Sequence, residues 1–121
     1  MKSKLLVVLT FFVFAIACNN KNVDVDLNYI LQHSNYDFLA DKDKIDCVVS
    51  DKNVDKPIVK CIEHDYKDNP VYFYLNKMND FYKIMKIEIF ADGVKHVIDD
   101  QVQIAEMVRE ANAEFYKKRR K

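Results

Sequence analysis

The sequence predicts an α+β domain: an antiparallel meander of about five strands, with an N-terminal helix and a C-terminal amphipathic helix packed on it. Short β-rich segments recur between residues 45 and 98, polar turns separate them, and a segment with helical periodicity lies on each side. The chain has 121 residues, 50% of them hydrophobic and 31% charged, which excludes a disordered chain and a multidomain enzyme. Its single Gly excludes a glycine-rich phosphate-binding loop.

Residues 1–17 are expected to be an export signal. Lys2 and Lys4 precede 12 residues, 5–16, that are apolar apart from Thr10. A helix of this length spans about 18 Å, which is too short for a hydrocarbon core of about 30 Å. A basic start followed by a short apolar run and small residues is typical of a signal peptide. The alternative is a buried N-terminal helix, which the lack of a polar face disfavours.

The apolar run ends in Ala15-Ile16-Ala17-Cys18, which resembles the lipobox of bacterial lipoproteins, although that family usually has Leu in place of Ala15. The resemblance implies cleavage between Ala17 and Cys18 and a lipid on the Cys18 thiol. Two or more acyl chains anchor a protein stably in a membrane, whereas a single chain does not. The alternative is an ordinary signal peptide that is cut after Ala17 and leaves Cys18 unmodified.

The polar residues 18–24 are expected to be a lipidated tether, and residues 25–121 a single domain that ends in a basic tail. Some bacteria retain lipoproteins at the inner membrane through an Asp directly after the lipidated Cys. This chain has Asn19 at that position, which favours the outer membrane if the source has two membranes.

The first helix of the domain is expected over residues 25–39, with Ser34 and Asn35 as interruptions. Its apolar side chains recur near helical spacing at Leu27, Ile30, Leu31 and Phe38.

Two strand-like segments, residues 45–49 and 57–62, follow this helix and are joined by a polar connection. They contain the two cysteines that remain when Cys18 carries lipid. If the two ends of the connection face each other, Cys47 lies directly opposite Cys61, within reach of a disulfide. A zinc site would need further ligands at a spacing that the chain does not have. An even pair of cysteines in an exported domain therefore predicts a Cys47–Cys61 disulfide.

Three further strands are expected at residues 71–75, 81–90 and 94–98. Alternation within the longest of them places Met85, Ile87 and Ile89 on one face, and Lys86 and Glu88 on the other. Asp92-Gly93 marks a tight hairpin before the last strand, where Gly accepts a positive φ.

The last helix is expected to begin at Asp100, with Gln103 completing a capping box. One of its faces carries Ile104, Val108, Ala111 and Phe115. The chain then ends in five basic residues, Lys117, Lys118, Arg119, Arg120 and Lys121. This basic tail is a candidate contact for anionic lipid headgroups, peptidoglycan carboxylates or an acidic protein. The alternative is a solvated helix end, where basic charge is favourable.

The tyrosines suggest a binding surface on the sheet. Tyr72, Tyr74 and, across a turn, Tyr82 are expected to share the face opposite Phe73. Tyrosine combines a flat apolar ring with a hydroxyl, which suits contacts with peptides, sugars or proteins. The alternative is that these rings only cover the sheet beneath the C-terminal helix.

No catalytic residue, metal site or cofactor is predicted. The three histidines lie in different segments without ligand spacing. Asp41, Asp43 and Asp46 are close in sequence, but intervening lysines and the lack of a nearby Gly favour a solvated loop over a calcium loop.

Three functions remain, and the first is favoured: a non-catalytic binding or adaptor protein, held to the envelope membrane by its lipid, that binds another envelope or extracellular protein. The second is a surface-exposed lipoprotein that inhibits or binds a host or competitor protein. The third is a small cell-wall hydrolase with carboxylates from among Glu63, Asp65 and Glu88, which no spacing selects. Nucleic acid is not expected as a partner, because residues 18–100 hold 11 lysines against 16 acidic residues.

Overall fold

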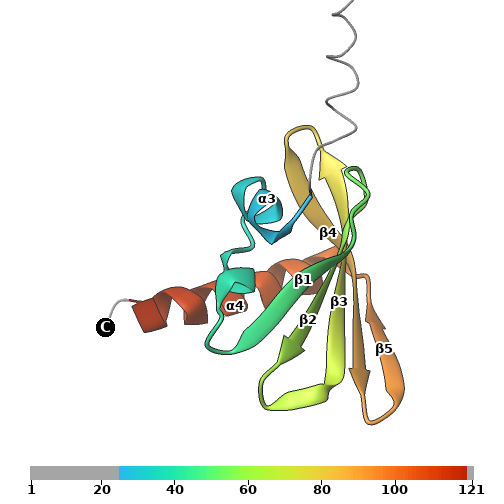
Figure 1. Cartoon of the computed structure of the whole chain (residues 1–121), viewed down its shortest axis with the longest axis vertical. Coiled ribbons are helices and arrows are strands. Elements are labelled where there is room, and N and C mark those ends of the chain that lie inside the picture. The colour runs from blue at the N-terminus through green and yellow to red at the C-terminus, as the bar shows by residue number, and fades with distance from the viewer. Residues whose placement is uncertain (1–24, 120–121) are drawn as a thin grey trace, which may run out of the picture.

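The computed structural model describes residues 25–119, which form a five-stranded antiparallel sheet with helices on one side of it (Figure 1). The elements in chain order are α3 (Leu27–Gln32), the 3₁₀ helix η1 (Asp37–Ala40), β1 (Ile45–Asp51), β2 (Ile58–Glu63), β3 (Tyr66–Met78), β4 (Phe81–Ala91), β5 (Val94–Ile98) and α4 (Gln101–Arg119). The strands lie in sequence order, which confirms the predicted α+β meander. The predicted signal peptide and tether, Cys18 among them, lie outside the described residues. Within the described residues, no helix has the length and apolarity needed to cross a membrane.

The predicted N-terminal helix is divided in two. Asp26 caps α3 by accepting a hydrogen bond from the backbone N–H of Tyr29 at 2.9 Å. The helix ends near Ser34, whose buried hydroxyl accepts from the backbone N–H of Tyr36 at 3.3 Å. A side chain that bonds to nearby backbone competes with helical hydrogen bonds, and the chain resumes only as η1.

The β4–β5 hairpin is tight, and β3 is longer than the sequence predicts. β5 spans the predicted residues, and Asp92 and Gly93 both adopt positive φ, 55° and 78°, as a two-residue hairpin loop requires. β3 begins at Tyr66 and ends at Met78, well beyond the predicted residues 71–75. Its polar ends are mostly exposed, so the strand continues without a hydrophobic signal in the sequence.

β3 and β4 pair with a bulge at Met85. Tyr74 faces Lys86 and the next residue, Leu75, faces Ile84, so Met85 has no cross-strand partner. The side-chain alternation shifts by one residue there. The inner face of β4 consequently carries Tyr82, Ile84, Ile87 and Ile89. The predicted face of Met85, Ile87 and Ile89 is wrong at Met85 for this reason.

The core lies between the inner sheet face and the helices. Asp100 starts α4 by accepting from the backbone N–H of Val102 at 2.9 Å. The predicted inner face of α4 is confirmed, with Ile104 and Phe115 buried and Val108 and Ala111 half-buried. The core cluster comprises Val25, Ile30, Leu39, Val59, Cys61, Phe73, Leu75, Tyr82, Ile84, Ile87 and Ile104. All members of this cluster lie between Val25 and Ile104, and they come from both helices α3 and α4 as well as from the sheet.

Candidate functional site

The sheet face that points away from α3, η1 and α4 carries one row of side chains that runs across all five strands. Directly paired residues contribute one member from each strand, namely Val48, Lys60, Tyr72, Glu88 and Val97. The two edge residues are exposed by 59% and 48%. The helices of the described chain pack on the opposite face (Figure 1), so this outer face is the candidate site.

Two of the three predicted tyrosines lie on this outer face. Tyr72 and Tyr74 are two residues apart on β3 and half-buried, with Phe73 between them pointing into the core. The prediction for Tyr82 is wrong. Its ring is 1% exposed on the inner face, and its hydroxyl donates to the carbonyl of Val54 at 2.6 Å. The bulge in β4 is the cause, because regular alternation would place Tyr82 outward.

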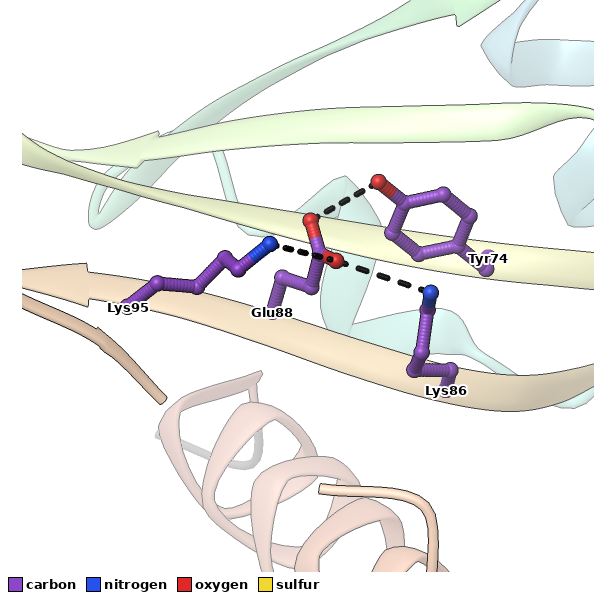
Figure 2. Close-up of polar contacts among 4 residues, drawn as sticks. All are labelled: Tyr74, Lys86, Glu88 and Lys95. Carbon is purple, nitrogen blue, oxygen red and sulfur yellow. Dashed lines mark hydrogen bonds and ion pairs between the residues drawn. The ribbon is translucent and has the colours of Figure 1, made fainter. Parts of the chain in front are cut away.

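Glu88 is the centre of a polar cluster on the outer face (Figure 2), although it is only 8% exposed. The hydroxyl of Tyr74 donates to Oε1 of Glu88 at 2.8 Å. Oε2 lies 3.5 Å from Nζ of Lys86 and 3.7 Å from Nζ of Lys95. The hydrogen bond from Tyr74, helped by the two lysines, lowers the pKa of Glu88 despite burial. The same hydrogen bond raises the pKa of Tyr74. At neutral pH the cluster therefore holds a carboxylate and a neutral phenol.

Aromatic rings and lysines surround this cluster. Nζ of Lys86 lies 4.3 Å from the ring centre of Tyr74, and Nζ of Lys60 lies 5.8 Å from that of Tyr72. The ring of Tyr72 also meets Phe90 edge to face at 5.8 Å. We call these seven residues the outer patch: Lys60, Tyr72, Tyr74, Lys86, Glu88, Phe90 and Lys95. Three ammonium groups against one carboxylate give the outer patch a positive balance beside flat apolar rings, which suits a partner that presents carboxylates.

The carboxylates considered for a hydrolase site do not lie close together. Glu63 pairs with Ile45 on the inner face, whereas Glu88 lies on the outer face. Asp65 is in the exposed turn between β2 and β3. Paired acid–base chemistry needs both carboxyl groups on one side of a cleft, and the sheet lies between these two.

Two of the three acidic residues considered for a calcium loop contact basic side chains: Asp41 in the segment before β1, and Asp46 within β1. Oδ2 of Asp41 lies 2.6 Å from Nζ of Lys118, and Oδ2 of Asp46 lies 3.2 Å from Nε2 of His64. In residues 25–119, no group of three or more His, Cys, Asp or Glu side chains is placed to hold a metal ion.

Part of the basic tail makes contacts within the domain itself. Lys117, Lys118 and Arg119 form the last turn of α4, and Lys118 pairs with Asp41, which is only 8% exposed. The guanidinium of Arg119 lies 4.4 Å from the ring centre of Phe115. The other two basic residues of the tail, 120 and 121, lie outside the described residues. Lys118 therefore secures the end of α4 rather than pointing only to an external anion.

The predicted disulfide is present. Cys47 and Cys61 face each other directly across β1 and β2 and are bonded, and Cys61 is buried. The polar cluster around Glu88 was not predicted from the sequence, although Lys86 and Glu88, two residues apart, indicate a shared strand face.

Comparisons of the chain with protein-family models, with curated protein sequences and with solved structures found no match. Its function is therefore inferred from its own residues.

Proposed function

We propose that this chain is a lipid-anchored protein of a bacterial envelope whose domain is a non-catalytic binding module, with the outer patch as its contact surface. The observation that carries the proposal is the Cys47–Cys61 disulfide, because disulfides persist in exported proteins and are rare in the reducing cytosol. The chain has three cysteines, so this pair leaves Cys18, at the end of the lipobox-like sequence, for lipid.

The outer patch supports binding of a partner that presents carboxylates. Lys86 and Lys95 are held near Glu88, and Lys60 near Tyr72, so the ammonium groups lose less freedom when a partner docks. Buried aromatic anchors at the centre of a contact usually carry most of the binding free energy. Tyr72 lies in the middle strand of the five and occupies that position on this face.

The lipid anchor is tested by metabolic labelling of the full chain with a palmitate analogue. The wild-type chain should incorporate the label and sediment with membranes, whereas Cys18→Ser should do neither. Cys61→Ser is the matched control, because it removes a cysteine but should leave labelling intact. Labelling that persists in Cys18→Ser would refute the lipid anchor.

The contact surface is tested by cross-linking on cells of the source bacterium that carry the full chain in its membrane. Tyr72→Ala should reduce the cross-linked product about tenfold or more. Tyr66→Ala is the control, since Tyr66 is 58% exposed but pairs with Glu63, away from the outer patch. Equal cross-linking by the wild type and Tyr72→Ala, with both proteins folded, would exclude the outer patch as the contact surface.

A further inference from the structure

A cavity of about 230 Å³ lies on the other side of the sheet, between its inner face and α4. The sheet contributes Phe73, Ile87 and Ile89 to its walls, and Met107 and Ala111 of α4 lie across from them. The walls are predominantly apolar. The cavity is distinct from the outer patch because alternate residues of β4 point to opposite sides of the sheet.

The volume is large enough for a ligand. An engineered apolar cavity of about 150 Å³ binds benzene, so by proportion this cavity accommodates roughly nine carbon atoms. Ala111 lines the cavity on the helix side, and a longer side chain at this position would reduce the volume. An apolar cavity of this size that opens to solvent is typical of a small-molecule site.

The charged side chains at the mouth indicate which headgroup fits. The charged residues of the lining are Asp41, Lys44, Glu63 and Glu114, of which Lys44 and Glu114 are exposed and Glu63 is half-buried. Nζ of Lys44 lies 3.6 Å from Oε1 of Glu114, so these two charges offset each other. Asp41, also at the cavity, is offset by Lys118 at 2.6 Å.

Glu63 is the remaining charge at the mouth. Its side chain is half-buried, and no ion pair or side-chain hydrogen bond within residues 25–119 involves its carboxylate. An anionic headgroup would be repelled there, whereas an ammonium group would gain an opposite charge.

We propose that this cavity binds a small cationic amphiphile: a primary amine with an unbranched alkyl tail of about eight carbons. The tail lies against Phe73, Ile87 and Met107, and its burial supplies most of the affinity. The ammonium group lies at Glu63 and gives the preference for a cation. This site goes beyond the proposed function, since the outer patch contributes none of its residues.

The test uses the full chain and measures binding of octylamine, octanol and octanoate by calorimetry. Octylamine should bind saturably, octanol about threefold more weakly, and octanoate more weakly than octanol, because a partly exposed ion pair contributes only a small factor. In Glu63→Gln, the affinities for octylamine and octanol should lie within twofold of each other, and the affinity for octanol should equal that of the wild type. Tightest binding of octanoate, or an amine preference that survives in Glu63→Gln, would overturn the assignment of the headgroup.

The position of the ligand's alkyl chain is tested by filling the cavity with a larger side chain. Ala111→Phe should weaken octylamine binding at least tenfold, whereas Ala113→Phe adds the same ring at an exposed position of α4 and should not change it. If Ala111→Phe does not unfold cooperatively, the smaller Ala111→Leu replaces it, with a loss of at least threefold expected. Absence of saturable binding in the wild type, or equal effects of the two phenylalanine variants, would overturn the proposal.

Discussion

Replacement of Tyr74 by Phe tests the polar cluster with the smallest change. The ring and its apolar contacts remain, and only the hydroxyl that donates to Oε1 of Glu88 is lost. A hydrogen bond to a charged group contributes about 1.5–3 kcal/mol. The low end applies here, because Lys86 and Lys95 still lie near the carboxylate. We therefore expect Tyr74→Phe to lower the free energy of unfolding by about 1.5 kcal/mol at pH 7.

The effect should depend on pH with a defined sign. The pKa of Glu88 is lowered in the fold, with the Tyr74 hydrogen bond as its largest cause. Such a carboxylate stabilises the fold above its unfolded pKa, which is near 4.5, and the contribution is lost as pH falls through the lower folded pKa. The difference between the wild type and Tyr74→Phe should therefore be full at pH 7 and clearly smaller at pH 3.

Urea unfolding followed by far-ultraviolet circular dichroism, with the disulfide intact, measures this difference. A loss of about 1.5 kcal/mol should lower the urea midpoint by roughly 1 M. Tyr72→Phe is the matched control, because Tyr72 lies two residues away on the same face and should lose no more than about 0.5 kcal/mol. The reasoning is refuted if the two variants lose equal stability at pH 7, or if the loss in Tyr74→Phe is undiminished at pH 3.

Three other changes give independent checks of the fold. Replacing Cys47 and Cys61 together by Ala should lower the free energy of unfolding by about 3 kcal/mol, because their bond closes a loop of about 15 residues. The melting temperature should fall by roughly 12–24 °C. A fall of less than about 4 °C would contradict this prediction. Asn112→Ala should lower the free energy of unfolding by about 2 kcal/mol, because the Asn112 side chain makes two hydrogen bonds, of 2.9 and 2.7 Å, to the backbone around η1. An unchanged midpoint of urea unfolding would contradict this prediction. Deleting Met85 should preserve cooperative unfolding and disulfide formation, because it restores regular alternation in β4; loss of the cooperative transition would show that the bulge is required.

Much of the sheet could be predicted because its signals are local. Turn residues such as Asp92 and Gly93 fix a hairpin within four residues, and the pairing register then follows from the strands beside it. The Cys47–Cys61 disulfide could be predicted in the same way, from the register of two strands on either side of a polar connection. The interruption of the first helix at Ser34 is likewise a local competition between side chain and backbone.

The unpredicted features depend on distant contacts. The cavity depends on how far α4 stands from the sheet, and that separation is set by contacts such as Asn112 with the backbone of Phe38 at 2.9 Å, 74 residues away. The ion pair of Lys118 with Asp41 likewise joins the two ends of the domain, so the tail could not be distinguished from a solvated helix end. Neither contact has a periodicity or spacing that a linear pattern could reveal.

The bulge at Met85 explains how one strand serves both proposed sites. If every residue of β4, Met85 included, alternated strictly, either Tyr82 and Ile84 or Ile87 and Ile89 would point outward, and β4 would lose half of its inward apolar side chains. With the bulge, both pairs point inward, and Glu88 is left among its lysines on the outer face. Ile87 lines the cavity and Glu88 anchors the outer patch, although the two are adjacent in sequence. Substitutions confined to one face should therefore affect one site alone. A variant that loses both kinds of binding has lost the sheet itself.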